Sequence, residues 1–347
     1  MSKSPGRVAD APPAPPGRAT IKDVSRLAGV SIKTVSRVLN KERYVAPATR
    51  EKIERVMAQV RFSPNPAARA LSGGRSFQIA LVCDNPSPFY VHDVQSGVQA
   101  RCRADGFRMV AQPYDHERDD MLAEVIALID QVKPDGLVLT PPISDRQAVI
   151  DSLNERRVPF VRISPAVPGD AGPSVGIDNE AAAFEIAGHL LALGHRRIAL
   201  IAGHPDYAAS GRRQAGYARA LAAAGVTLDP ELIRQGWFSF ASGAAAADAL
   251  LDLSEPPTAI LASSDDMAAG ALARAHARGL AVPEALSVAG FGDTALAQLV
   301  WPPLTSVSQP VRELGHLAVD LLLGGDTGHH VLPHRLAIRG STGPAPR

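Results

Sequence analysis

Apolar residues recur at helical spacing in two short stretches near the amino terminus: Ile21, Val24, Leu27 and Ala28, and then Val35, Val38 and Leu39. Thr20, followed by Asp23, forms a capping-box pattern at the start of the first stretch. Gly29 can end that helix, because glycine tolerates the positive φ of a helix exit. Ser31 can cap the second helix. The pattern predicts two amphipathic helices joined by a tight turn.

A third helix is predicted from 47 to 59, because Pro47 favours a first helical turn and apolar side chains share one face. These side chains are Ile53, Val56, Met57 and Val60. Together the three helices predict an all-α domain over residues 20–62, preceded by a Pro-rich leader over 1–19 that we expect to be disordered.

A further short helix is predicted in the segment 63–75. Asn65 is a suitable cap before Pro66, and two glycines, Gly73 and Gly74, provide the stop. At about seven residues such a helix is too short to be stable alone in water. We expect it to order only against a partner chain and DNA; the alternative is an ordinary linker turn.

From residue 77 onward, continuous apolar runs alternate with helical patterns. Strands are predicted at 77–83, 108–112, 136–140, 158–163, 197–202, 258–262 and 286–291. Helices are predicted at 91–104, 117–132, 145–156, 180–193, 211–224, 241–253, 266–278 and 311–323. This alternation predicts an α/β core of two doubly wound lobes over 76–340, followed by a tail over 341–347. A ligand would then bind between the lobes, beyond the carboxyl ends of the strands.

Charge separates the amino-terminal helices from the rest of the chain. The whole chain has a formal net charge of only +1, yet residues 20–72 hold eleven Lys and Arg against four Asp and Glu. The second helix also presents hydrogen-bonding, basic and methyl-bearing groups on its outer face, which are the types that read base edges and hold phosphates. We therefore interpret residues 20–62 as a helix-turn-helix whose second helix enters the major groove of DNA.

Other features narrow the class of protein. The two cysteines, Cys83 and Cys102, have no metal-ligand spacing, and no metal or cofactor is expected. No run of about 20 apolar residues indicates a membrane span. Residues 1–19 do not form a signal peptide, so we expect a cytoplasmic, nucleoid-associated protein.

The residues resemble the lactose-repressor (LacI) family of bacterial transcription regulators over about 20–340. The head carries Ile-Lys-Asp-Val, Ala-Gly-Val-Ser and Thr-Val-Ser-Arg-Val-Leu-Asn, then Thr49-Arg-Glu and Pro64-Asn. The body carries Leu193-Gly-His-Arg-Arg, Arg213-Gln-Ala-Gly-Tyr, Ser264-Asp-Asp-Met, Leu286-Ser-Val-Ala-Gly-Phe and Pro303-Leu-Thr-Ser-Val. The resemblance implies a helix-turn-helix head, a hinge helix and a type I periplasmic-binding-protein-like core. It also implies a homodimer, or a dimer of dimers, on pseudo-palindromic operator DNA.

The resemblance assigns DNA-binding roles to residues of the head and the hinge. The implied major-groove readers are Ile32, Lys33, Ser36 and Arg37. The implied phosphate contacts are Thr20, Ser31, Thr34, Asn40, Tyr44 and Thr49. In the hinge, Asn65 and Ala68 are implied to contact DNA, and Leu71 is implied to wedge into the central minor-groove step. Ala46 departs from the family pattern, because a Ser or Thr often caps the third helix there.

The resemblance also implies a small-molecule effector, usually a sugar or a nucleobase, and we expect a carbohydrate. The implied effector-binding residues are Asp84, Asn85, Ser164, Arg213, Phe238, Ser264, Asp265, Asp293 and Gln309. Ser264 stands where many members have Asn, and Gly292 where many have Asp. We therefore expect Asp293 to take over the role of the missing acid, or the effector to lack the corresponding hydroxyl. For Asp265 and Arg213, a helix cap and a surface ion pair are the alternative roles.

Three other functions are possible for a chain with these features. An enzyme is disfavoured, since neither a Gly-x-Ser-x-Gly, nor a Walker, nor a zinc-ligand pattern is present. A transport-binding protein would share the core but would need a signal peptide and have no use for the basic head. Within the regulator class, a repressor released by its effector is expected, and a corepressor-dependent repressor is the alternative.

Overall fold

The computed structural model describes residues 19–39, 44–62, 75–114, 120–167 and 171–346. The chain divides into two compact units, residues 1–76 and 77–347, and each is described here by itself.

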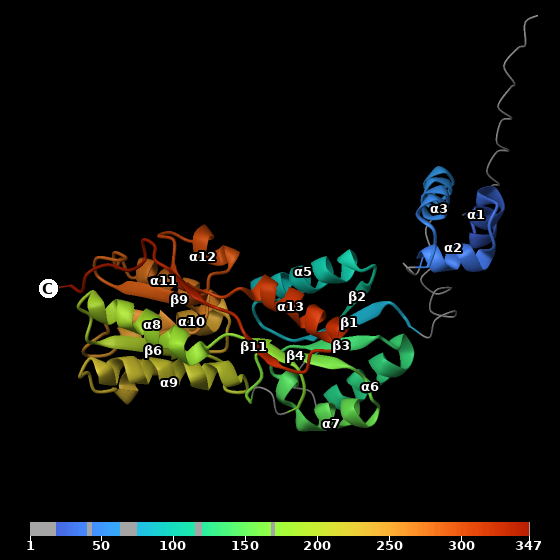
Figure 1. Ribbon diagram of the computed structural model, residues 1–347. Helices are drawn as coiled ribbons and strands as arrows, with labels where there is room; N and C mark the ends of the chain where they lie inside the picture. The colour runs from blue at the N-terminus through green and yellow to red at the C-terminus, as the bar shows by residue number, and fades with distance from the viewer. Residues whose placement is uncertain (1–18, 40–43, 63–74, 115–119, 168–170, 347) are drawn as a thin grey trace, which may run out of the picture. The chain divides into compact units, whose positions relative to one another are not determined.

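The first unit contains α1 (Ile21–Ala28), α2 (Ile32–Leu39) and α3 (Pro47–Gln59), drawn in blue in Figure 1. The predicted capping box is present: the Asp23 N–H donates to Thr20 Oγ1 at 3.4 Å, and the Thr20 N–H donates to Asp23 Oδ2 at 3.0 Å. Gly29 ends α1 with a φ of +62°. The prediction of two capped helices with a glycine turn is therefore confirmed.

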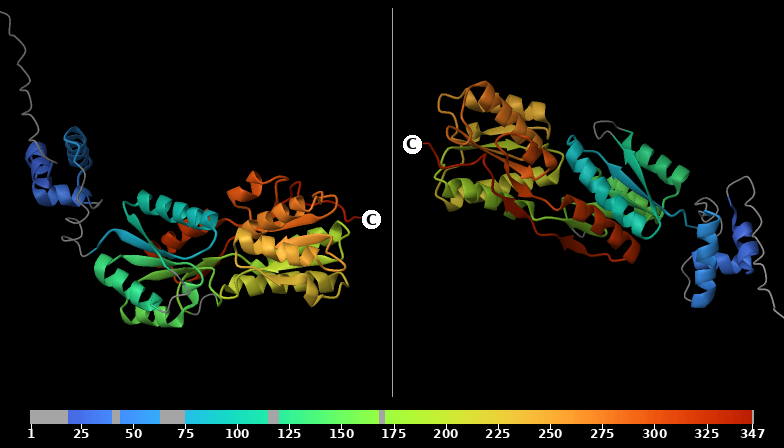
Figure 2. Two further views of the ribbon diagram at one scale, coloured as in Figure 1. Left: turned by 180° about the vertical axis from the view of Figure 1, so that it is seen from behind. Right: turned by 90° about the horizontal axis from the view of Figure 1, so that it is seen from above.

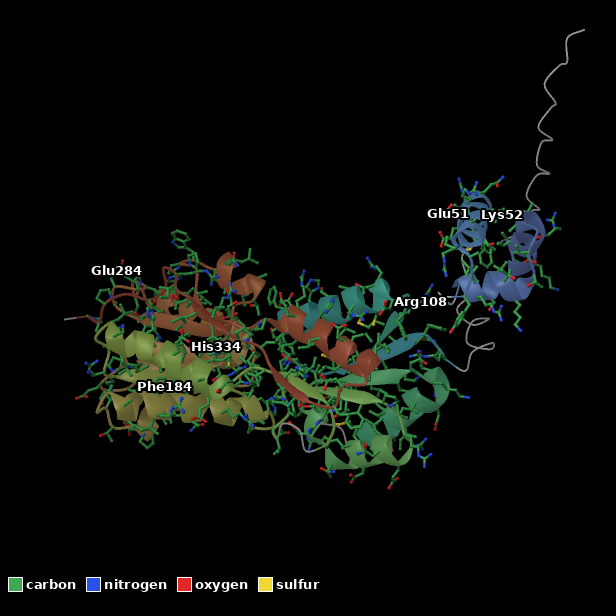
Figure 3. All side chains as sticks on the ribbon, in the orientation of Figure 1. Glu51, Lys52, Arg108, Phe184, Glu284 and His334 are labelled. Atoms are coloured by element: carbon green, nitrogen blue, oxygen red, sulfur yellow. The ribbon has the colours of Figure 1, made fainter. Side chains whose placement is uncertain are left out.

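A small apolar core joins the three helices. Its fully or nearly fully buried members are Val24, Ala28, Val35, Val38 and Ile53. Charged side chains of α3, such as Glu51 and Lys52, lie on the exposed side of that helix (Figure 3). Ala46 precedes α3 and forms no side-chain cap, because its methyl group cannot accept a hydrogen bond. All three predicted helices form, with buried faces where the sequence pattern placed them.

The second unit consists of two lobes, each built on a six-stranded sheet (Figure 1). The amino-terminal lobe orders its strands β11-β5-β4-β3-β1-β2, and the carboxyl-terminal lobe orders them β12-β10-β9-β8-β6-β7. All strand pairs are parallel except β10 with β12. The first sheet comprises β1 (Gln78–Cys83), β2 (Arg108–Pro113), β3 (Gly136–Leu139), β4 (Phe160–Ile163), β5 (Ser174–Gly176) and β11 (His329–Val331). The second comprises β6 (Ile198–Ala202), β7 (Ile233–Gln235), β8 (Ala259–Ala262), β9 (Ser287–Gly292), β10 (Thr305–Ser308) and β12 (Arg335–Ala337).

Helices cover both faces of each sheet (Figure 2). In the amino-terminal lobe, α5 (Pro88–Ala104) and α13 (Val311–Gly324) pack on one face, and α6 (Met121–Val132) and α7 (Gln147–Glu155) pack on the other. In the carboxyl-terminal lobe, α8 (Asn179–Ala192) and α9 (Ala208–Ala223) lie opposite α10 (Phe240–Leu251), α11 (Asp265–Ala277) and α12 (Ala295–Leu299). The two predicted doubly wound lobes are confirmed, and both faces of their central strands are buried.

The chain passes between the lobes three times, after β5, after β10 and after β11. The last two passages enclose α13, so that this late helix completes the amino-terminal lobe. Residues that follow the carboxyl ends of β1, β4, β8 and β10 line a common cavity, which lies where the two lobes meet. The topology thereby brings distant parts of the sequence to one site.

Several short elements were not predicted: β5, β7, β10, β11, β12 and α12. Each spans three to five residues, and the polar sequence of β10 does not resemble a buried strand. The predicted tail also differs, because it packs on the carboxyl-terminal lobe. Ser341 is fully buried and donates from Oγ to the Val288 carbonyl at 2.6 Å, and the Ala345 N–H donates to the Leu193 carbonyl.

Candidate functional site

The outer face of α2 presents the side chains predicted to read DNA. Ile32 is 45% exposed, an unusual value for isoleucine, and Lys33 and Arg37 are exposed beside it. Ser31 caps the helix by accepting the Thr34 N–H at 3.1 Å, and the two hydroxyls lie 2.8 Å apart. This face therefore combines an apolar contact with two cations, while Ser31 and Thr34 fix the start of the helix.

The predicted phosphate contacts lie in different environments. The Thr20 hydroxyl donates to Asp23 Oδ2 at 2.7 Å and serves the cap of α1. Tyr44 is 93% exposed, and Thr49 is half-buried in the first turn of α3. The predicted residues Asn40, Asn65, Ala68 and Leu71 lie outside the residues that the structure describes.

The cavity between the lobes has a volume of about 70 Å³ and gathers seven of the nine predicted effector-binding residues. These are Asn85, Ser164, Arg213, Phe238, Ser264, Asp265 and Gln309. They come from the segments that follow β1, β4, β7, β8 and β10, and from the helix α9. The predicted position of the site, beyond the carboxyl ends of the strands, agrees with this cavity.

Arg213 on α9 is the buried cation of the cavity. Its Nε donates to Asn179 Oδ1 at 2.9 Å, its Nη1 donates to the Ser263 carbonyl at 2.5 Å, and the guanidinium stacks 3.7 Å from the centre of the Phe291 ring. Burial lowers the pKa of this guanidinium to about 9. None of the described carboxylates pairs with it, so Nη2 remains available to an oxygen of a ligand.

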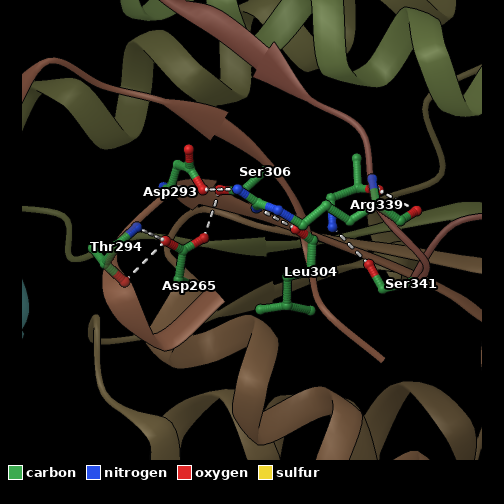
Figure 4. A network of polar contacts seen from close by, with 8 residues as sticks. Asp265, Asp293, Thr294, Leu304, Ser306, Arg339 and Ser341 are labelled. Carbon is green, nitrogen blue, oxygen red and sulfur yellow. Dashed lines mark hydrogen bonds and ion pairs between the residues drawn. The ribbon is translucent and has the colours of Figure 1, made fainter. Parts of the chain in front are cut away.

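Asp265, at the start of α11, forms its side-chain hydrogen bonds within its own lobe (Figure 4). Its Oδ2 accepts the Thr294 N–H at 2.7 Å and the Thr294 hydroxyl at 3.1 Å, and its Oδ1 accepts the Ser306 hydroxyl at 2.6 Å. Burial raises the pKa of this carboxyl to about 6, and these hydrogen bonds offset part of the rise. The carboxylate thus ties α11 to the ends of β9 and β10 and has few lone pairs left for a ligand.

Asp293, predicted to line the cavity, does not. Arg339 binds it from β12's carboxyl-terminal side, with 2.6 Å between Nη2 and Oδ1 (Figure 4). The backbone at Asp293 has a φ of +52°, and its N–H donates to Ser306 Oγ. Gly292 lines the cavity instead, with a φ of +133° that strains any side chain. Asp293 therefore does not replace the acid missing at position 292.

Asp84 is also absent from the cavity lining. Its backbone carbonyl accepts the Tyr207 hydroxyl at 3.1 Å, which joins the amino-terminal lobe to the carboxyl-terminal lobe. Arg212 makes a second such contact by donating from Nη2 to the Ala166 carbonyl. Arg146 and Asp206 form a third, at 3.5 Å. The lobes are therefore in contact around the cavity.

Comparison with known proteins identifies the family. Residues 20–65 match the model of bacterial regulatory proteins of the lacI family, and 187–342 match a periplasmic binding protein-like domain. The HTH-type transcriptional regulator DegA of Bacillus subtilis is 36% identical over 341 residues, which cover 94% of this chain and 99% of DegA. The chain belongs to the LacI family. Like its relatives, it is a DNA-binding transcriptional regulator and not an enzyme.

Two solved structures of LacI-family members share the fold. The Lac repressor dimer bound to operator and the anti-inducer ONPF superposes with a TM-score of 0.79 at 30% identity, over 94% of this chain and 100% of that one. The complex of the transcriptional regulator CelR with cellobiose gives 0.70 at 34% identity, over 93% and 100%. Both cover the head and the core together.

Sequence reasoning missed several lining residues, among them Ser87, Asn179, Tyr207 and Asp266. Tyr207 stands just before α9, and Asn179 is the first residue of α8; a position at the start of a helix could have marked both. Ser87 precedes α5 in the same way. Among the described residues, none of the groupings of His, Cys, Asp and Glu could hold a metal ion, and none of the described helices is long and apolar enough to cross a membrane.

Proposed function

We propose that this LacI-family regulator is a repressor that binds a pseudo-palindromic operator as a homodimer and leaves it when a carbohydrate effector enters the cavity. The observation that carries the effector role is the cavity itself, where Arg213 has an unused donor and both lobes contribute side chains. A molecule bound there contacts both lobes, so it changes the equilibrium between their arrangements by its differential affinity.

The operator role rests on the exposed face of α2. A cation with the planar fork of Arg37 can donate two hydrogen bonds to guanine, and Ile32 offers a methyl-bearing surface for thymine. The Lac repressor of similar fold was solved as a dimer on operator. Leu299 and Trp301 support a dimer here, because they are 75% and 79% exposed apolar side chains close together in the chain.

A carbohydrate is favoured by the polar lining and by the relative solved with cellobiose. Hydroxyl groups can accept from Arg213, and they can donate to the amide oxygens of Asn85 and Gln309. Arg213 Nη2 carries two N–H groups in the plane of the guanidinium, so it presents donors to a ligand in a fixed geometry that the ammonium of lysine cannot match.

The test uses the full chain and an operator selected from random duplexes, with binding followed by fluorescence anisotropy. We expect one dimer per selected duplex, loss of binding on deletion of residues 1–75, and release on addition of a sugar that raises the unfolding temperature. A sugar that tightens binding instead would favour the corepressor alternative. Unchanged operator binding by the deleted protein would refute the DNA-binding assignment. Leu71→Ala should weaken specific binding more than non-specific binding, because only a kinked site uses the wedge.

A further inference from the structure

Asp266 and Ser87 face the cavity from opposite lobes. Asp266 lies in the first turn of α11 in the carboxyl-terminal lobe and is 8% exposed. Ser87 precedes α5 in the amino-terminal lobe and is 5% exposed. Both line the cavity that also contains Arg213. The pair was not among the residues that sequence reasoning assigned to the site.

The two side chains are poorly paired within the protein. Ser87 Oγ is buried and makes no hydrogen bond of ordinary geometry to a described residue. Burial has the largest effect on Asp266 and raises the pKa of its carboxyl, whereas weak hydrogen bonding from the Ser87 hydroxyl and from the backbone N–H of Asp266 lowers it. Buried polar groups in proteins normally have well-formed hydrogen bonds, so two poorly paired groups that line one cavity indicate a ligand.

The neighbouring acid provides the contrast. Asp265 accepts three hydrogen bonds from Thr294 and Ser306, whereas Asp266 accepts none from these residues. Adjacent residues on a helix point in different directions. Asp265 therefore points into its own lobe, and Asp266 lines the cavity with most of its hydrogen-bonding capacity unused.

Resting on the function proposed above, we propose that Asp266 and Ser87 bind a hydroxyl or amino group of the effector, which is a neutral or amino monosaccharide. Such a group donates to the carboxylate and accepts from the serine hydroxyl. The carboxylate of a sugar acid, or a sugar phosphate, placed there would be repelled by Asp266. At about 70 Å³ the cavity is small for a ligand site, which favours one sugar ring over two.

The Asp266–Ser87 pair also joins ligand recognition to contact between the lobes. A ligand group bound to both residues bridges the two lobes directly, because each lobe supplies one of them. Arg213 binds oxygens elsewhere on the ligand from within the carboxyl-terminal lobe. The sugar would thus be oriented by an acceptor at one end and a donor at the other.

The first experiment needs no ligand. Thermal unfolding of the full chain at pH 8 is compared for wild type, Asp266→Asn and Asp265→Asn. We expect Asp266→Asn to unfold at the same or a higher temperature, because it removes a buried charge that is poorly paired. Asp265→Asn should unfold at a lower temperature, because it disturbs three hydrogen bonds. If Asp266→Asn is destabilised as much as Asp265→Asn, Asp266 serves α11 and the proposal is overturned.

The second experiment measures binding by calorimetry to neutral pentoses and hexoses, their amino-sugar counterparts, and the matching sugar acids and sugar phosphates. We expect wild type to bind neutral or amino sugars only, Asp266→Asn to lose affinity about 10- to 100-fold, and Ser87→Ala to lose about 3- to 10-fold. Binding of only acids or phosphates, unchanged affinity of Asp266→Asn, or no binding to any member overturns the proposal. A protein that binds a sugar acid and then releases operator would still retain the function proposed above.

Discussion

Removal of the Tyr207 hydroxyl would show how strongly this hydrogen bond holds the two lobes together in the absence of a ligand. Tyr207 precedes α9, is 4% exposed, and donates across the cleft to the Asp84 carbonyl at 3.1 Å. Its ring packs edge-on against Phe238 and His204, with centroids 5.2 and 5.3 Å apart. Tyr207→Phe keeps that packing and removes one donor. The substitution therefore changes one interaction between the lobes and little within either lobe.

The expected magnitude follows from the worth of one hydrogen bond. A neutral intramolecular hydrogen bond contributes about 0.5–1.5 kcal/mol net. Because this bond exists only while the lobes touch, its loss should shift the equilibrium toward separated lobes by about 2- to 13-fold. An effector that binds the joined arrangement then binds more weakly by up to the same factor, since the competent state is less populated.

Small-angle scattering of the free and ligand-bound protein measures the arrangement of the lobes, and calorimetry measures the affinity. We expect a larger radius of gyration in the free variant, a bound radius like that of wild type, and a weaker affinity. Asp206→Asn is the control, because its pair with Arg146 is about half exposed and such pairs are worth about 0–1 kcal/mol. Wild-type values of both radius and affinity in Tyr207→Phe would refute the idea that this bond holds the lobes together.

Three further predictions concern the head and the core. Arg37→Ala should cost about 1–3 kcal/mol of operator affinity and reduce discrimination between duplexes; equal losses on all duplexes would assign Arg37 to phosphates. Ala46→Ser should stabilise α3 by about 1 kcal/mol, measured as slower hydrogen exchange of its amides, and unchanged exchange would mean that the cap does not form. Burial lowers the pKa of His195, which bonds Thr258 and Gly343. The unfolded chain therefore takes up this proton first as pH falls through about 6.5, and stability should decrease below that pH. His195→Gln should reduce this slope in thermal unfolding, and an unchanged slope would show that other groups cause it.

The elements that sequence predicted well are those whose own residues determine them. The capped helices α1 and α2 and the continuous apolar strands β1 and β6 combine local signals with burial on both faces. The missed strands depend on their neighbours. β11 contains two histidines, and β10 is rich in Ser and Thr, so their pairing follows from the sheet that receives them. Such tertiary placement overrides local propensity.

The residues of the site also separate into those that local sequence identifies and those that only tertiary packing identifies. Arg213 and Gln309 could be placed by resemblance, because Arg213 begins a family motif and Gln309 follows another by two residues. Asp293 could not, because its pairing with Arg339 depends on β12, a strand that the sequence did not predict. Asp266 was not predicted to bind the effector, and only the packing of α11 separates a hydrogen-bonded acid from one that lines the cavity.

The strand β1 runs from the start of the core to the edge of the cavity. Its carboxyl end leads into Asp84, which accepts the Tyr207 hydroxyl, and then into Asn85, which lines the cavity. Its amino end follows Phe77, whose N–H donates to Asp135 Oδ2 at 2.9 Å. Between these ends the strand is hydrogen-bonded on both sides, to β2 and to β3. Asn85 and the residue at which the chain enters the core therefore lie at opposite ends of one strand, so a ligand that displaces Asn85 acts on the strand into which segment 63–75 leads.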